Sequence, residues 1–268
     1  MTAIRQWLTQ HRDLPQIECE ILLSEVMGLS RAQILAYPER DIPSHGLCQL
    51  KHLTEQLRNG IPLAYITGSR EFWGLDLHVS PHVLIPRPET ELLVELVIEL
   101  APMNGNLIDL GTGSGAIAIA VKTERPDLCV TATDTSCPAL NIARGNATNH
   151  GVEVSFQQQS WLQGNATQWD MIISNPPYIA TNDPHLSCLA AEPVQALIAG
   201  EDGLDDIRQI IAQAPAHLCA GGYLLIEHGF DQAASVQQLM LNAGFGHVQS
   251  RKDLAGINRV TLAQHAGR

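Results

Sequence analysis

The residues with the clearest chemistry are Ser174-Asn175-Pro176-Pro177-Tyr178. They follow the apolar run Met171–Ile173, which predicts a buried strand, and open α/β sheets bind ligands where strands end. The two prolines fix φ and remove two N–H donors. A rigid edge of acceptors remains, the side-chain carbonyl of Asn175 and the backbone carbonyl of Pro176, beside the ring of Tyr178. Such an edge suits a planar –NH2 group, which offers two donors. The alternative is a strand that ends in a plain Pro-Pro turn.

A second pattern precedes this motif along the chain. Asn106–Leu110 predicts a strand, Gly111-Thr112-Gly113-Ser114-Gly115 a tight turn, and Ala116–Val121 the start of a helix. Glycines let backbone and ligand approach closely, and the N–H groups of the turn and of the helix N-terminus then face the ligand. Asp109 stands two residues before the turn. A glycine-rich turn alone is weak evidence, because dinucleotide sites share it.

The next predicted strand, Cys129–Thr133, ends on Asp134. A carboxylate in that place can bind both hydroxyls of an adenosine ribose. The turn and this acid together resemble the S-adenosylmethionine site of Rossmann-like methyltransferases. That likeness implies that Asp109 orients the turn or meets the amino group of the methionyl tail. Trp161, one loop further, either lies against adenine or is an ordinary core tryptophan.

The rest of the chain predicts the frame for these residues. Apolar residues recur at helical spacing up to about residue 65, which indicates a small helical module without catalytic residues of its own. Residues 66–86 alternate like a hairpin and form a linker. From 87 to 268, strands and helices alternate and a hairpin ends the sheet. In this second part we expect a helix from Gly200 towards Leu218, a strand Val152–Gln157, and a loop Thr181–Pro193 that serves as lid or substrate cradle.

Charge and composition exclude several classes of function. The net charge is −12, which disfavours binding to nucleic-acid phosphates. The six cysteines have no zinc-like spacing and indicate reduced thiols in a cytoplasmic protein. We expect no metal site, no signal peptide, and no run that approaches the roughly 18 apolar residues of a membrane span.

The whole pattern resembles the release factor glutamine methyltransferase family, and the likeness covers nearly the entire chain. The matching stretches are Arg70-Glu71-Phe72-Trp73, Ile85-Pro86-Arg87-Pro88-Glu89-Thr90-Glu91, Asp109 to Gly115, Asn175 to Tyr178, Glu227-His228-Gly229 and Arg259-Val260-Thr261. Two positions depart from the family pattern. Ala191 stands where an aromatic residue often precedes Glu-Pro, and Asn258 stands where an acid often precedes Arg-Val.

The resemblance implies a Rossmann-like α/β fold with a seven-stranded S-adenosylmethionine-dependent methyltransferase domain, a small N-terminal helical domain for substrate recognition and a β-hairpin linker. It implies S-adenosylmethionine as cofactor and, as substrate, the glutamine of a Gly-Gly-Gln loop in peptide-chain release factors. We expect a monomer without direct nucleic-acid binding. The residues expected to bind cofactor are Asp109, Gly111, Thr112, Gly113, Ser114, Gly115, Asp134, Trp161 and Asn175. Those expected to bind substrate are Asn175, Pro176, Pro177 and Tyr178, with Asn175, Pro176 and Tyr178 catalytic.

Two other functions remain open at this point. The first is a methyltransferase for adenine or cytosine amino groups, which present the same two donors, although the acidic balance offers little for a phosphate backbone. A non-catalytic binding module would keep the fold and the cofactor, but the intact Asn175 and glycine turn argue against it. Arg87 is equally open, since it either meets an anionic or carbonyl group or pairs with Glu89 or Glu91 at the surface.

Overall fold

The computed structural model describes residues 2–164 and 166–267. The chain divides into two compact units, Met1–Ser69 and Arg70–Arg268. Each unit has a hydrophobic core of its own, drawn from its own residues.

The first unit is helical. It contains α1 (Ile4–Gln10), α2 (Gln16–Met27), α3 (Arg31–Ala36), α4 (Ser44–Arg58) and α5 (Leu63–Thr67), and a two-stranded sheet of β1 (Thr2–Ala3) and β2 (Asp41–Ile42). Local residue types explain two of its helix ends, because Gly28 ends α2 in the left-handed region and the Ser30 side chain caps α3. Its hydrophobic core consists of the buried residues Ile4, Trp7, Cys19, Leu22, Leu23, Ile34, Ile42 and Leu50.

The last helix of this unit, α5, runs two residues past the expected limit of the helical module at about residue 65. It begins after Pro62 and ends at Gly68 with φ of 76°. Pro62 and Gly68 are therefore the two caps of a short helix.

The second unit is built on a seven-stranded sheet in the order β10-β11-β9-β8-β5-β6-β7. Its strands are β5 (Asn106–Leu110), β6 (Cys129–Asp134), β7 (Ser155–Gln158), β8 (Trp169–Ser174), β9 (Leu218–Glu227), β10 (Gly246–Lys252) and β11 (Asn258–Gln264). Strands β7, β6, β5, β8 and β9 run parallel, and β11 is antiparallel to both β9 and β10. The expected α/β fold with a terminal hairpin is confirmed.

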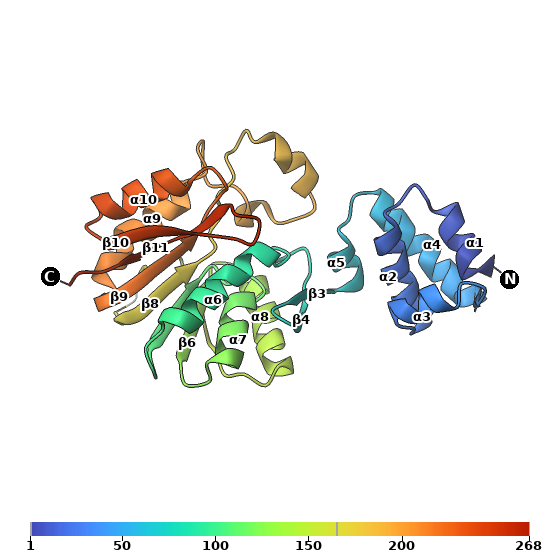
Figure 1. Cartoon of the computed structure of the whole chain (residues 1–268), viewed down its shortest axis with the longest axis horizontal. Helices are drawn as coiled ribbons and strands as arrows, with labels where there is room; N and C mark the ends of the chain where they lie inside the picture. The colour runs from blue at the N-terminus through green and yellow to red at the C-terminus, as the bar shows by residue number, and fades with distance from the viewer. Residues whose placement is uncertain (1, 165, 268) are drawn as a thin grey trace. The chain divides into compact units, whose positions relative to one another are not determined.

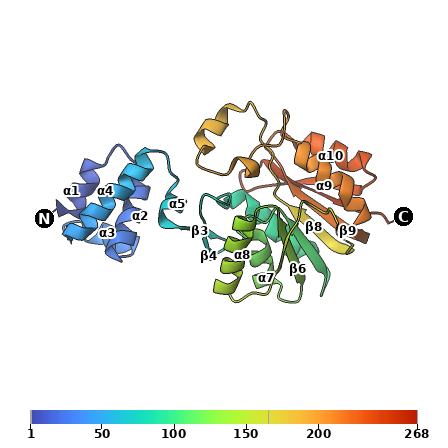
Figure 2. The ribbon, with the colours of Figure 1, turned by 180° about the vertical axis from the view of Figure 1, so that it is seen from behind.

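Helices cover both faces of this sheet. On one face lie α6 (Glu91–Leu100), α7 (Ala116–Glu124) and α8 (Cys137–Asn149), and on the other lie α9 (Asp205–Gln213) and α10 (Ala233–Asn242) (Figures 1 and 2). Neighbouring residues of one strand serve opposite faces: Leu107 packs with α6 and α7, whereas Ile108 packs with α9 and α10. The central strands are buried on both sides, which explains their continuous apolar runs.

The hairpin of β3 (Ser69–Phe72) and β4 (Leu75–His78) leads into the second unit. Asn146 of α8 anchors its end, because its Oδ1 accepts a bond from the His78 N–H at 2.8 Å and its Nδ2 donates to the His78 carbonyl at 3.0 Å. The same Nδ2 donates to the Ser114 carbonyl at 2.9 Å. One buried amide thus connects the hairpin to the glycine turn.

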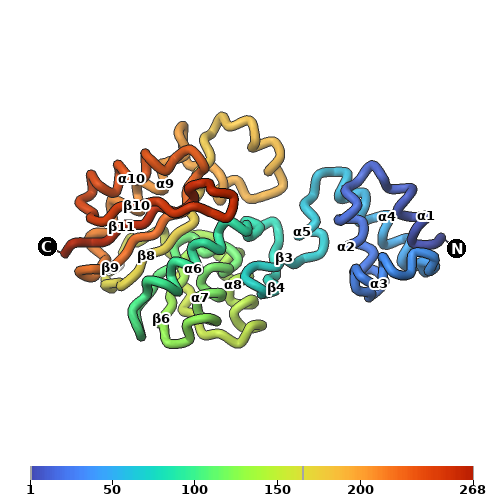
Figure 3. The backbone as a smooth tube through the Cα atoms, in the orientation of Figure 1, coloured from blue at the N-terminus to red at the C-terminus, as the bar shows by residue number. Residues whose placement is uncertain are grey.

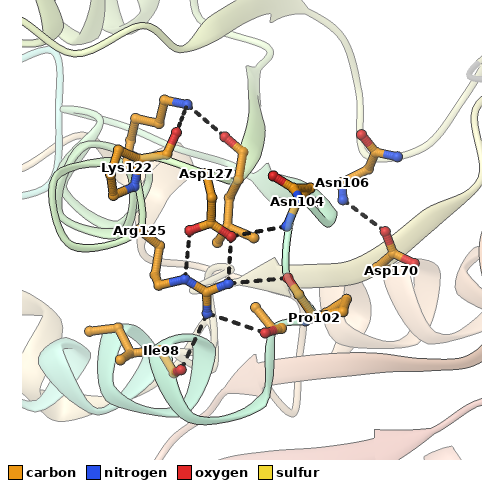
Figure 4. A network of polar contacts seen from close by, with 11 residues as sticks. Ile98, Pro102, Asn104, Asn106, Lys122, Arg125, Asp127 and Asp170 are labelled. Atoms are coloured by element: carbon orange, nitrogen blue, oxygen red, sulfur yellow. Dashed lines mark hydrogen bonds and ion pairs between the residues drawn. The ribbon is translucent and has the colours of Figure 1, made fainter.

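The Asn-Pro-Pro-Tyr motif follows the carboxyl end of β8, and a polar network fixes the opposite ends of the parallel strands, where β5 begins (Figure 4). Arg125 pairs with Asp127 at 2.7 Å and donates to the carbonyls of Ala101 and Pro102 after α6. Asp170 of β8 accepts a bond from the Asn106 N–H at 2.8 Å, where β5 begins. These contacts set where β5 starts, and so where its carboxyl end lies.

The chain makes its longest excursion between β8 and α9 (Figure 3). The expected loop Thr181–Pro193 contains the short 3-10 helix Pro184–Leu189, and a second one, Val194–Ala196, follows it. Three other boundaries move from those expected. The third parallel strand begins at Ser155 and not at Val152, and α9 begins at Asp205 and ends at Gln213.

Candidate active site

The larger cavity of the second unit, about 560 Å³, lies at the carboxyl ends of β5, β6 and β8. Its size is within the usual range for a small-molecule site. It is lined by His82, Val83, Leu84, Gly111, Gly113, Asp134, Thr135, Ser136, Ala139, Gln159, Ser160, Trp161, Asn175, Pro177, Pro193, Gln195, Ala196, Asp206 and Gln209. Parallel strands deliver these residues to one edge of the sheet because all their carboxyl ends point the same way.

The glycine turn forms one wall of this cavity. Gly113 has φ of 56°, and a Cβ at this position would meet no atom within 4 Å. Its N–H donates to Asp134 Oδ2 at 2.9 Å, and the Ser136 N–H donates to Asp134 Oδ1 at 2.8 Å. Each oxygen of an ionised carboxylate keeps a further acceptor site after one such bond. Asp134 is therefore held rigidly at the cavity with capacity for two more donors.

Asp109 lies beneath the turn and is fully buried. Thr112 Oγ1 donates to its Oδ2 at 2.6 Å, whereas Oδ1 has no hydrogen-bond partner among the described residues. Burial raises the pKa of Asp109 to about 7, although the Thr112 bond opposes the shift. Asp109 shapes the turn from behind, since it is absent from the described lining of the cavity.

Trp161 forms another part of the cavity wall and has a left-handed backbone with φ of 46°. Its ring lies next to the glycine turn, because a Cβ built on Gly111 would touch it at 3.4 Å. The ring is only partly buried and lines the cavity, which separates it from a core tryptophan such as Trp169. A flat aromatic face is thus presented one loop beyond Asp134.

Asn175 joins this cavity to a smaller one of about 240 Å³ and lines both. Its Nδ2 donates to Thr90 Oγ1 at 3.1 Å. Its Oδ1 is buried and has no hydrogen-bond partner within the described parts of the chain. A buried acceptor without a donor is costly, so its retention at the junction of two cavities indicates a role in binding.

The smaller cavity is mostly apolar and is lined by Leu84, Arg87, Asn175, Pro176, Tyr178, Ile179, Leu189, Ala196 and Leu197. Burial raises the pKa of Tyr178 to about 12, so its phenol stays neutral at physiological pH. Pro176 and Tyr178 thus line one cavity together with Asn175. Pro177, expected beside them, lines the larger cavity.

Arg87 pairs with Glu192, not with the neighbouring Glu89 or Glu91 that the sequence suggested. Glu192 is buried, and its second oxygen accepts a bond from the Ile85 N–H at 3.1 Å. The excursion after β8 is therefore attached to the segment before α6. Glu91 instead accepts a bond from the Trp73 N–H at 2.9 Å.

The structure brings most of the expected residues together at the two cavities. Thr112, Ser114 and Gly115 build the turn without lining a cavity, and a Cβ on Gly115 would lie 3.1 Å from Ala143 Cβ in α8. Sequence reasoning missed Leu84, Ala196, Asp206 and Gln209. The first two carry no chemical signal, and an acid in the first turn of α9 is typical of any helix.

Solved structures with a similar fold include two methyltransferases. A methyltransferase from Pyrococcus furiosus is 18% identical, covers 83% of this chain and 99% of its own, and gives a TM-score of 0.58. A Thermus thermophilus 16S rRNA N2 G1207 methyltransferase, solved with AdoMet and guanosine, is 18% identical over 75% of this chain and 50% of its own, with a TM-score of 0.56. At this identity the likeness concerns the fold alone.

Comparisons of sequence are more specific. The family model "PrmC N-terminal domain" matches residues 1–68, and "Methyltransferase small domain" matches residues 88–196. A protein of Neisseria gonorrhoeae named release factor glutamine methyltransferase is 46% identical over 97% of both chains. A protein of Pseudomonas aeruginosa with the same name is 46% identical over 94% of this chain and 93% of its own. The chain belongs to the release factor glutamine methyltransferase family.

Proposed function

We propose that this protein methylates the side-chain amide nitrogen of the glutamine in the Gly-Gly-Gln loop of peptide-chain release factors, with S-adenosylmethionine as methyl donor. The observation that carries the proposal is that Asn175 lines both the large and the small cavity and has a buried Oδ1 without a hydrogen-bond partner among the described residues. The names of the relatives support the substrate.

The larger cavity fits the cofactor in size and in chemistry. Asp134 offers two acceptor sites to ribose hydroxyls, and Gly113 leaves open space against the backbone of the turn. Trp161 offers a flat face to adenine. Asn175 touches the same cavity and so borders both the cofactor and the substrate. When bound, S-adenosylmethionine supplies an electrophilic methyl group on a sulfonium centre.

The smaller cavity fits the side chain of one glutamine. An amide nitrogen is a weak nucleophile because its lone pair is delocalised into the carbonyl group. Asn175 Oδ1 and the Pro176 carbonyl accept hydrogen bonds from the two N–H groups of the glutamine amide. This arrangement favours a pyramidal nitrogen whose lone pair points towards the larger cavity. Tyr178 packs against the flat amide and excludes water.

No dedicated base is needed for this reaction. The methylated nitrogen is strongly acidic, so it loses one proton to water after the N–C bond has formed, and the amide regains its conjugation. The contribution of the protein is the orientation of reacting groups at short range, which can be worth about 7–11 kcal/mol. Glycines beside the target glutamine lack side chains, so the loop can reach a recessed strand end.

The division of labour between the parts of the chain is also part of the proposal. Residues 1–65 recognise the release factor, 66–86 form the linker and 87–268 carry out the chemistry. The protein acts as a monomer in the cytoplasm, where release factors work, and its free cysteines suit a reducing compartment. It binds no nucleic acid, in keeping with its net charge of −12. In the described part of the chain, no helix combines the length and apolarity needed to cross a bilayer.

Mass spectrometry after incubation with cofactor tests the function. The enzyme should add one methyl group to the glutamine of the Gly-Gly-Gln loop of an intact release factor. Single- and double-stranded DNA are offered in parallel, because nucleobase amino groups present the same two donors. Methyl incorporation into DNA at the rate seen with the protein substrate would establish the nucleobase alternative instead.

A further inference from the structure

Glu227 is a buried carboxyl group that lies beside Asn175 without lining either cavity. Ser174 of β8 pairs with Ile226 of β9 in a parallel register, so the next residues, Asn175 and Glu227, stand side by side at the ends of their strands. Glu227 is 1% exposed, and β11 covers its other side through Val260. It is absent from the described linings of both cavities, so it acts on the site only through a neighbour.

Two side chains connect Glu227 to the site. Asn175 Nδ2 donates to Thr90 Oγ1 at 3.1 Å, and a hydroxyl that accepts one bond still has its own hydrogen to donate. Burial raises the pKa of Glu227 to about 7, and the neighbouring Thr90 and Asn175 side chains oppose this shift. Oε2 of Glu227 has no hydrogen-bond partner among the described residues, so the carboxyl group has acceptor capacity left for these two neighbours.

A carboxylate accepts hydrogen bonds and donates none. Beside the ionised Glu227, Asn175 and Thr90 must both present hydrogens. The NH2 end of the Asn175 amide then faces Glu227 and Thr90, and its Oδ1 faces away from them. That oxygen is the buried acceptor without a partner among the described residues. With the amide reversed, an NH2 group would face the NH2 group of the substrate, and two donors cannot bond to each other.

We propose that Glu227 and Thr90 are positioning residues, which hold the side-chain amide of Asn175 with its oxygen directed at the substrate nitrogen. The proposal rests on the proposed function, because that orientation matters only for a substrate that donates hydrogen bonds there.

The hydroxyl of Thr90 allows a test that separates positioning from packing. Thr90 is 4% exposed, so valine matches its buried shape but lacks the hydroxyl, whereas serine keeps the hydroxyl and loses a methyl group. Positioning predicts that Thr90→Ser keeps kcat close to the wild-type value. It predicts that Thr90→Val lowers kcat about ten- to hundredfold, with the KM for a Gly-Gly-Gln peptide less affected. A role in packing predicts the reverse order, and that order would overturn the proposal.

The pH profile is the second measurement. In the wild type, kcat should rise as Glu227 ionises in the neutral range, and in Glu227→Gln it should be low at every pH and lack this rise. Two ionisable groups shift the pKa of Glu227: Arg259 on β11 lowers it, and Glu89 before α6 raises it. The phenol of Tyr178 after β8 also faces Glu227, which helps to raise the Tyr178 pKa to about 12, so the phenol stays neutral. A Glu227→Gln variant with the wild-type profile would contradict the proposal.

A third measurement does not depend on turnover. Exchange of the Asn175 side-chain NH2 protons, followed by NMR, should be slow in the wild type and in Thr90→Ser. It should be faster in Thr90→Val and in Glu227→Gln. Equal exchange in all four proteins would overturn the positioning role, whatever the substrate. A wild-type enzyme that methylates no release factor, yet shows this exchange pattern, would refute the proposed function and leave the positioning intact.

Discussion

The guanidinium of Arg87 forms an ion pair with the carboxylate of Glu192, 105 residues further along the chain. Glu192 is held from a second side by the Ile85 N–H at 3.1 Å. Arg87 also lines the smaller cavity, together with Leu189 of the excursion that carries Glu192. One charged pair thus fixes two walls of the proposed glutamine site relative to each other.

Breaking this pair should lower both stability and substrate affinity. Arg87→Met leaves the buried Glu192 carboxylate with one partner fewer, which should reduce the free energy of unfolding by about 1–3 kcal/mol. Because 33% of the Arg87 side chain is exposed, the cost stays below that of a fully buried pair. Urea denaturation measures it, and the KM for a Gly-Gly-Gln peptide should rise. Adding Glu192→Gln to Arg87→Met should cost less than the two single changes summed, and strict additivity would disprove the coupling.

Replacing Asn175 by alanine should abolish most of the methyl transfer while the protein still folds and binds cofactor. The lost contact matters chiefly in the transition state, so kcat should fall about 10²–10³-fold, as when one preorganised hydrogen-bonding group is removed from other active sites. Single-turnover kinetics measure the fall, and calorimetry measures cofactor affinity. Rates within a few-fold of the wild type would rule out the acceptor edge as the source of catalysis.

Asp134→Ala should weaken the binding of S-adenosylmethionine by about 1.5–3 kcal/mol, the range for a hydrogen bond that involves a charge. Asp170→Ala is the matched control, because Asp170 also accepts a backbone N–H bond at 2.8 Å but lies at the opposite edge of the sheet. Titration calorimetry compares the two variants. The ribose assignment fails if both bind cofactor as the wild type does.

The stability of the second unit should fall as the pH rises from about 4.5 towards 7. The pKa of Glu227 is raised from 4.5 to about 7, so within this window the unfolded chain has lost a proton that the folded chain keeps. Since the unfolded state then binds fewer protons, the free energy of unfolding decreases with pH and levels off above about 7. The pKa of Asp109 is also raised, from 3.8 to about 7, and this adds to the decrease in stability. The decrease should amount to a few kcal/mol at most.

Denaturation curves across this pH range measure the effect, and Glu227→Gln should flatten the dependence. Asp127 does not interfere, because Arg125 lowers its pKa. The stability that Asp127 contributes is therefore lost only below pH 3.8. A wild-type protein whose stability rises between pH 4.5 and 7 would show that other groups dominate the linkage.

Removing residues 1–67 should leave an active methyltransferase with poor recognition of its protein substrate. The second unit has its own cores around both faces of the sheet, so it should fold without the helical module. The KM for an intact release factor should rise about tenfold or more, which corresponds to about 1.4 kcal/mol of lost binding, while that for a short Gly-Gly-Gln peptide should change little. Parallel kinetics on both substrates measure the difference. An equal rise for both would place recognition elsewhere.

Local chemistry explains why so much of the fold was readable from the sequence. The glycine turn, the Asn-Pro-Pro-Tyr motif and Asp134 each follow a predicted strand, and parallel strands bring their carboxyl ends to one edge. Gly28 and Ser30 mark helix ends through backbone preferences that act within a few residues. The boundaries that moved, such as the starts of α9 and β7, depend on packing and not on local preference.

The sequence by itself determined the class of the sheet, the place of the cavity and the acceptor edge at Asn175. It did so because strand periodicity, proline geometry and glycine freedom act through nearest neighbours along the chain. Only the tertiary structure decided the partner of Arg87, the removal of Asp109 from the cavity wall and the placement of Glu227 behind Asn175. Those relationships join residues far apart in sequence, and burial in a shared interior sets both their contacts and their pKa values.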